Sequence, residues 1–194
     1  MPPSEALKRN SIDWEEKLRF RPTAQRNLVK PADWQQYPYP FIYGQIDSSL
    51  FPVNEWRACC RDAGSIGAIH RWSADGVDQD DPDLVEQIHT RILPRRGVWA
   101  QPDEILVTLG AQQALYLTAD LLLTEDQVVA MEEPGYPDAR NIFAARTARI
   151  EALAVDDKGL VPGSALSHCQ CLYLTPSHQF PSTVTLSRDR RETL

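Results

Sequence analysis

The stretch Val107–Ala114 reads Val-Thr-Leu-Gly-Ala-Gln-Gln-Ala, and Glu132–Pro137 reads Glu-Glu-Pro-Gly-Tyr-Pro. The first predicts a strand that turns at Gly110 into a helix N-terminus. There, free backbone N–H groups and the positive end of the helix dipole suit a phosphate. The second ends a short apolar run and places Tyr136 on a Pro-rich turn. A phosphate site followed by an aromatic side chain suits a flat, phosphorylated aromatic cofactor, and the order of the two points to pyridoxal phosphate.

Length and composition are those of an ordinary globular chain. Its 194 residues are enough for one domain, with room for an appendage. The net charge of −7 argues against a dedicated surface for nucleic acid or an anionic membrane. No stretch approaches the apolar length of a membrane span. The four cysteines have no zinc-site or C-x-x-C spacing, which favours a reduced, cytoplasmic location.

Residues 1–45 differ from the rest and are expected to form an N-terminal arm or linker. They hold Trp14, Trp34, Tyr37 and Tyr39 among many charges and prolines, without a long apolar period. A short helix is predicted over 13–19, and an extended stretch over 22–41. The aromatic residues favour an arm that packs on another surface. The alternative is a disordered linker or an added leader.

Residues 46–194 have the pattern of a globular domain. A helix is predicted to begin at Pro52, and another to run from Pro82 to Leu93 and to end at Gly97. Buried strands are predicted over 104–109, 127–131, 148–155 and 169–175. Helices are predicted over 111–123 and 138–146, and a turn over 156–159. Strands that alternate with helices predict an α/β fold with a largely parallel sheet.

Each candidate binding residue also has an ordinary structural interpretation. Gly110 lets the backbone approach a ligand closely, and Ala111 and Gln112 supply N–H groups at the helix start. The alternative is a simple strand-to-helix turn. Tyr136 could stack on a ring or only pack between two prolines. His178 follows a strand end, where ligands bind in open α/β sheets, but the spacing alone also fits a loop histidine.

Several motifs together resemble the aminotransferase-like half of MocR-type proteins, which belong to the GntR superfamily of regulators. The resemblance runs from about Asp47 to Leu194. The Ser-His-Gln-Phe-Pro run is its most specific element, because general aminotransferases usually carry Asn-Pro-Thr-Gly there. The matching elements are Ser49–Trp56, Arg95–Gly97, Gly110–Ala114, Glu133–Pro137, Thr175–Pro181 and Arg190-Arg191. Without the resemblance, this last pair is expected on a solvated face.

The resemblance implies a fold and a set of ligand contacts. The fold is a three-layer α/β sandwich with a mostly parallel sheet: the N-terminal part of a fold-type-I large domain, of aminotransferase class I/II type. Ala111 and Gln112 would hold the phosphate of pyridoxal 5'-phosphate, Tyr136 would stack on its ring, and His178 would lie beside it. The chain departs from the family pattern at Ser182-Thr183, where the second residue is usually glycine. A homodimer is expected by analogy.

Pyridoxal-phosphate chemistry also needs a lysine and an acidic partner for the ring nitrogen. The resemblance implies that both follow the Arg190-Arg191 element. The lysines of this chain are Lys8, Lys17, Lys30 and Lys158, and none fits that position. We therefore assign no catalytic or metal-ligating residue.

The expectation is a truncated aminotransferase-like domain, unable to catalyse amino-group transfer by itself. In a full-length relative, its partner would be a small amino acid or amine. A second hypothesis is a non-catalytic, effector-sensing module of a regulator that has lost its DNA-binding half, so that the chain itself binds no nucleic acid. A third is a folded remnant that binds nothing.

Overall fold

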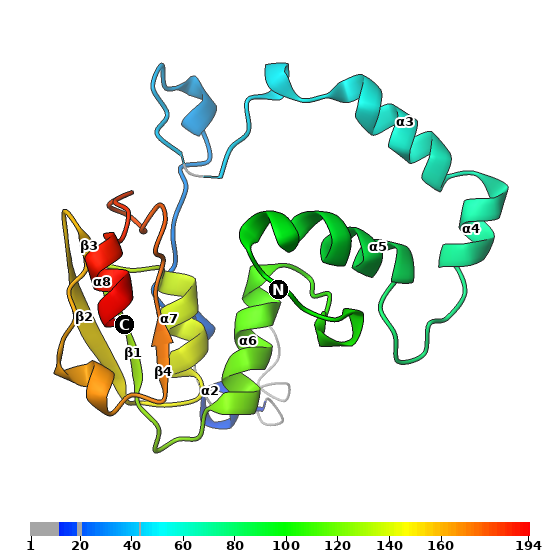
Figure 1. The fold of residues 1–194 in the computed structure, drawn as a ribbon. Helices are drawn as coiled ribbons and strands as arrows, with labels where there is room; N and C mark the ends of the chain where they lie inside the picture. Colours follow the sequence, from blue (N-terminus) through cyan, green and yellow to red (C-terminus); the bar gives the residue numbers. More distant parts are fainter. Residues whose placement is uncertain (1–11, 19–20, 43) are drawn as a thin grey trace, which may run out of the picture. The chain divides into compact units, whose positions relative to one another are not determined.

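The computed structural model describes residues 12–18, 21–42 and 44–194, which form two compact units (Figure 1). One unit combines the described residues up to Val29 with Leu109–Leu194, and the other is Lys30–Thr108. The predicted boundary between arm and domain near residue 45 stays a prediction. Lys8 and Arg19 lie outside the described residues.

A four-stranded sheet in the order β3-β2-β1-β4 forms the centre of the first unit. The central strand β1 (Val129–Glu133) pairs in parallel with β2 (Ile150–Asp156) and with β4 (Cys171–Tyr173). The short strand β3 (Gly159–Leu160) follows the predicted turn and pairs antiparallel with β2. Three predicted strands are thus confirmed. Because β1, β2 and β4 are parallel, their carboxyl ends share one edge of the sheet.

Apolar residues cover both faces of this sheet and make the fold three-layered. Helices α6 (Ala111–Leu122) and α7 (Pro137–Ala144), both predicted, pack on one face around Met131 and Phe143, each 1% exposed. A short 3-10 helix, Ser164–Ser167, and the segment through Leu186 cover the other face. The buried residues of the first face are Ala119, Leu123, Val129, Met131, Ala139 and Phe143. Those of the second are Ala130, Leu153, Leu160, Ala165 and Leu186.

The unit Lys30–Thr108 is helical. Helix α5, for example, begins after the N-cap residue Asp81, with a proline as its first residue. The Asp81 side chain accepts a hydrogen bond from the Leu84 backbone N–H at 2.9 Å. The predicted helix end at Gly97 is confirmed, with a φ of 68° there. The elements are α3 (Val53–Ala63), α4 (Ile66–Trp72), α5 (Pro82–Gln87), a π-helical stretch Ile88–Ile92, and 3-10 turns at Trp34–Gln36, Ser48–Leu50, Pro94–Arg96 and Pro102–Glu104.

The predicted strand over 104–109 is wrong. The segment leaves a 3-10 turn and continues as irregular backbone, and it pairs with none of the four described strands. The backbone N–H of Val107 donates instead to the Asp80 carboxylate at 2.7 Å. Leu106 is 70% exposed and Leu109 is 91% exposed. The apolar pattern is present, but a strand also needs a neighbouring strand for its hydrogen bonds.

The expectation of a solvated Arg190-Arg191 face is wrong for Arg190, whereas Arg191 is exposed. Both residues lie on α8 (Arg188–Thr193). Arg190 pairs with Asp156, and its side chain is 19% exposed. Arg191 donates to the backbone carbonyl oxygens of Leu186 and Pro176 at 2.9 and 3.2 Å. The guanidinium groups therefore join the C-terminal helix to the sheet, which a charge pattern alone does not predict.

The described part of the arm contains α2 (Trp14–Lys17) and a 3-10 turn at Pro22–Ala24, so the stretch predicted to be extended is partly helical. The side chain of Asn141 on α7 donates to the Arg26 carbonyl oxygen at 2.8 Å. This bond holds the arm on the first unit. Among the described residues, no helix is long and apolar enough to cross a membrane.

Candidate functional site

The N-terminus of α6 has backbone N–H groups of the kind that bind anions at helix ends. Gly110 precedes the helix with φ 85°, a conformation that side chains other than glycine rarely adopt, and a Cβ built there would meet no atom within 4 Å. The first intrahelical bond joins the Ala114 N–H to the Gly110 carbonyl oxygen. The N–H groups of Ala111, Gln112 and Gln113 precede it and point out of the helix end. The space and donors required by a phosphate are therefore present.

Tyr136 lies on the loop after β1 and starts α7 as its N-cap residue. It is half-buried, and its ring meets the ring of Phe180 edge-to-face, with 5.9 Å between centroids and an angle of 71°. Phe180 comes from the loop after β4, which neighbours β1 in the sheet. Two aromatic residues from separate loops thus meet beyond the carboxyl ends of adjacent strands.

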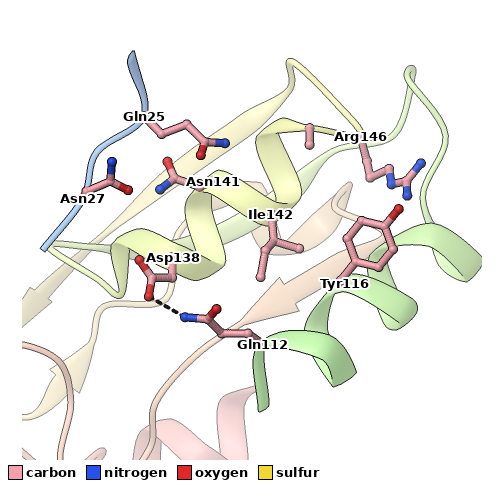
Figure 2. A pocket seen from close by; sticks show the side chains of 9 residues that line it. Gln25, Asn27, Gln112, Tyr116, Asp138, Asn141, Ile142 and Arg146 are labelled. Atoms are coloured by element: carbon pink, nitrogen blue, oxygen red, sulfur yellow. Dashed lines mark hydrogen bonds between the residues drawn. The ribbon is translucent and has the colours of Figure 1, made fainter. Parts of the chain in front are cut away.

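Asp138 joins the two predicted parts of the site, and it was not predicted from the sequence. Its Oδ2 accepts hydrogen bonds from Gln112 Nε2 at 2.7 Å and from the Tyr136 hydroxyl at 2.8 Å (Figure 2 shows the first). Gln112 Nε2 also lies 3.4 Å from the Tyr136 hydroxyl oxygen. The start of α6 and the tyrosine loop are therefore connected directly. In the sequence, Asp138 is visible only as an acidic residue two positions after Tyr136, at the start of the helix predicted over 138–146.

A buried polar network connects the loops after β1 and β4. Glu132, 2% exposed, accepts from the backbone N–H and the hydroxyl of Thr175 at 3.0 and 2.6 Å. Gln179, 1% exposed, donates to the Pro134 carbonyl oxygen at 2.8 Å and lies 3.4 Å from the Glu132 carboxylate. Buried polar groups are satisfied in this way because an unmatched one costs about 1–3 kcal/mol. The network fixes both loops that carry the aromatic pair.

His178 has a different position from the other predicted residues. It is exposed, has φ 58°, and its Nδ1 lies 3.0 Å from the Ser177 hydroxyl oxygen. It shares the loop of Gln179, but no described contact joins its side chain to Gln112 or Tyr136. The structure therefore brings Gln112 and Tyr136 together, with Gly110 and Ala111 beside Gln112 in the chain, and leaves His178 at the loop surface.

The Tyr173 hydroxyl has a pKa that is changed by its burial near the sheet edge. Tyr173 on β4 packs against Phe143, with 5.7 Å between ring centroids. Burial raises the pKa of the Tyr173 hydroxyl above its ordinary value, and the nearby Tyr136 and Glu132 add to this rise. Tyr173 therefore stays a neutral hydroxyl near neutral pH.

Comparison with known proteins gives relatives that are mostly named as regulators. The chain is 44% identical over 179 residues to the HTH-type transcriptional regulator TauR of Rhodobacter capsulatus, a match that covers 92% of this chain and 37% of TauR. It is 26% identical over 184 residues to the "Probable rhizopine catabolism regulatory protein MocR" of Rhizobium meliloti, covering 93% of this chain and 37% of that protein. The chain thus spans just over a third of the length of these relatives. No family model matches it.

Among solved structures, the fold is similar to LysN, the α-aminoadipate aminotransferase of Thermus thermophilus, complexed with N-(5'-phosphopyridoxyl)-L-leucine. The TM-score is 0.63 at 26% sequence identity, and the match covers 79% of this chain and 39% of LysN. The fold prediction is thus confirmed. By sequence the chain is a homologue of the MocR-type regulators of the GntR superfamily, and its fold is similar to part of the fold-type-I aminotransferase fold.

Proposed function

We propose that the first unit carries one side of a pyridoxal-phosphate site in the effector-sensing part of a MocR-type regulator. The observation behind this proposal is the direct connection of the α6 N-terminus to the tyrosine loop through Asp138. A phosphate at Ala111 and Gln112 and a ring beside Tyr136 would occupy one continuous surface. The solved relative LysN carries a phosphopyridoxyl group, which supports the choice of ligand.

Each residue has a distinct role in this proposal. The backbone N–H groups of Ala111 and Gln112 bind the phosphate, and Gly110 leaves room for it. Tyr136 contacts one face of the pyridine ring, with its own orientation fixed by Asp138 and Phe180. Glu132 and Gln179 are positioning residues, because they hold the two loops together from beneath. His178 borders the site from the exposed part of the β4 loop.

The named relatives support a sensing role. When bound, pyridoxal phosphate supplies an aldehyde that reacts with primary amines and a ring that withdraws electrons. Of the described lysines, Lys17 lies on α2, Lys30 belongs to the helical unit, and Lys158 lies in the turn between β2 and β3. None of these residues lies on the loops of the site. TauR and MocR are both named as regulators, and we propose that this chain serves a protein of that kind.

Comparing pyridoxal 5'-phosphate with pyridoxal, which lacks the phosphate, tests the proposal. In fluorescence titrations the phosphorylated compound should bind at least about tenfold more tightly, the effect of one or two charge-assisted hydrogen bonds. Gly110→Val should remove most of this difference, because a branched side chain blocks the backbone N–H groups.

Gly97→Val is the matched control. Gly97 also has positive φ and open space at its Cβ position, but it belongs to the other unit. Its variant should keep the preference for the phosphorylated compound. Equal binding of the two compounds by the unmodified chain would contradict the proposed phosphate site.

A further inference from the structure

A segment of the arm forms one wall of a cavity that lies between α6 and α7 in the first unit. Gln25 and Asn27 from the arm line this cavity together with Asn141 and Ile142 from α7 (Figure 2). Its volume is about 520 Å³, within the range of small-molecule sites. We propose that residues 25–29 form a latch: docked on α7, the latch closes this side of the cavity, and its release opens the cavity to solvent.

Arg26 holds the latch on the first unit through its backbone and its side chain. Its carbonyl oxygen accepts a hydrogen bond from Asn141 Nδ2 on α7 at 2.8 Å. Its guanidinium Nη1 lies 3.8 Å from the carboxylate of Glu133, the last residue of β1. The same carboxylate pairs with Arg140 of α7 at 3.3 Å. One arm residue is thus fixed to both the helix and the end of the central strand.

Polar contacts, rather than buried apolar side chains, hold the latch in place. Among the arm residues that the structure describes up to Val29, none is buried, and only Gln25 and Leu28 are half-buried. The side chain of Arg26 is 70% exposed, and ion pairs of such exposed groups contribute little. Because apolar burial is the dominant force that keeps a segment folded, the latch opens locally while the sheet stays intact.

The latch connects the cavity with two other parts of the chain. On one side, Glu133 lies three residues before Tyr136, whose hydroxyl donates to Asp138 in the cavity wall. On the other side, Val29 is the last arm residue of the first unit, and Lys30 is the first residue of the helical unit. Release of the latch therefore frees the stretch of chain that leads into the helical unit.

Limited trypsin digestion tests the latch, because cleavage after Arg26 requires its side chain and carbonyl group to leave their contacts. Proteolysis of a segment that opens and closes rapidly follows the population of its open form. Asn141→Ala removes one hydrogen bond and should raise cleavage at the Arg26–Asn27 bond about two- to tenfold. Asn141→Leu, which keeps a similar size in the helix, should raise cleavage by a similar factor.

Two controls separate release of the latch from general unfolding. Asn54→Ala is the matched variant, since Asn54 lies on α3 of the helical unit, and it should leave cleavage after Arg26 unchanged. Cleavage at the Lys158–Gly159 bond, in the turn between β2 and β3, reports unfolding of the sheet. It should stay the same in the unmodified chain and in both Asn141 variants.

Access to the cavity gives a second measurement. Ala145, the C-cap residue of α7, lines the cavity, so Ala145→Cys places a thiol in its wall. Adding Asn141→Ala to this variant should speed alkylation of the thiol by iodoacetamide severalfold, as mapped by mass spectrometry. The exposed thiol of Cys59 is the reference in the same sample.

Three results would overturn the proposal. The first is equal cleavage after Arg26 in the unmodified chain and in both Asn141 variants. The second is a rise at Lys158 as large as the rise at Arg26, because the arm would then not open separately from the sheet. The third is unchanged alkylation at position 145, because the arm would then not close the cavity. No cofactor is present in these assays, so their outcomes are independent of the phosphate test at Gly110.

Discussion

The guanidinium group of Arg190 forms a bidentate ion pair with the carboxylate of Asp156: Nη1 lies 2.6 Å from Oδ1 and Nη2 lies 2.6 Å from Oδ2. Nη1 also donates to the carbonyl oxygens of Gly159 and Leu160 at 2.8 and 3.1 Å. This bidentate pair connects α8 to the end of β2 and to the hairpin that follows. The pair therefore holds α8 against the sheet.

The stability of the fold should depend on this pair at acidic pH. The hydrogen bonds from Arg190, and then the Lys158 backbone N–H, lower the pKa of Asp156 to about 2 from the ordinary 3.8. Since the folded state has the lower pKa, the contribution of this ion pair to the free energy of unfolding is complete above about pH 3.8. It is lost as the pH falls toward about 2. In urea unfolding between pH 2 and 6, the free energy of unfolding should fall less on acidification for Asp156→Asn than for the unmodified chain. A loss equal to that of the unmodified chain would contradict this.

Replacing the buried carboxylate of Glu132 should destabilise the chain more than replacing its neighbour. Glu132→Gln puts an NH2 group among the donors of Thr175 and Gln179, and we expect a loss of about 1–3 kcal/mol in the free energy of unfolding. Glu133→Gln is the control. Glu133 makes exposed ion pairs with Arg26 and Arg140, which contribute about 0–1 kcal/mol. Equal losses in urea unfolding would show that the network does not hold the two loops.

Two variants of Tyr136 separate its ring from its hydroxyl. Tyr136→Phe keeps the edge-to-face contact with Phe180 but loses the hydrogen bond to Asp138, whereas Tyr136→Ala loses both. In titrations with pyridoxal 5'-phosphate, we expect a small loss for Tyr136→Phe. For Tyr136→Ala we expect a further loss of about 0.5–1.5 kcal/mol, typical of aromatic contacts. If Tyr136→Ala binds as well as the unmodified chain, the ring is only a packing residue.

Thr183→Gly should stabilise the chain. Thr183 has φ 63°, a left-handed conformation that is unfavourable for a β-branched residue. Its N–H donates to the Gln179 carbonyl oxygen at 2.6 Å, and the Gln179 N–H in turn donates to the Val184 carbonyl oxygen, so the turn is closed on both sides. Relief of about 1–2 kcal/mol of strain should exceed the greater entropy of glycine in the unfolded chain, about 0.5–1 kcal/mol. A lower melting temperature for Thr183→Gly would show that the threonine is not strained.

The chain should show no amino-group transfer by itself. It has four lysines, and none of the described ones lies on the loops of the proposed site. Incubation with pyridoxal phosphate and a panel of amino and keto acids should give only the background of the free cofactor. Transfer above that background, abolished by Lys158→Arg, would contradict this expectation.

The sequence by itself determined the elements whose signals are local. The glycine before Ala111, the proline at the start of α7 and the apolar runs of β1, β2 and β4 each act over a few residues, and the structure confirms all of these elements. The motifs around Gly110, Tyr136 and Gln179 also identified the family, because their order along the chain is itself specific.

Tertiary structure decided the contacts between segments that are distant in the sequence. The apolar run over 104–109 predicted a strand, but no described strand pairs with it, and Arg190 meets Asp156 across 34 residues. Asp138 became part of the candidate site only because α6 and α7 pack side by side and bring Gln112 within 2.7 Å. Local propensity acts through neighbouring residues, whereas strand pairing and ion pairing depend on partners that only the folded chain brings together.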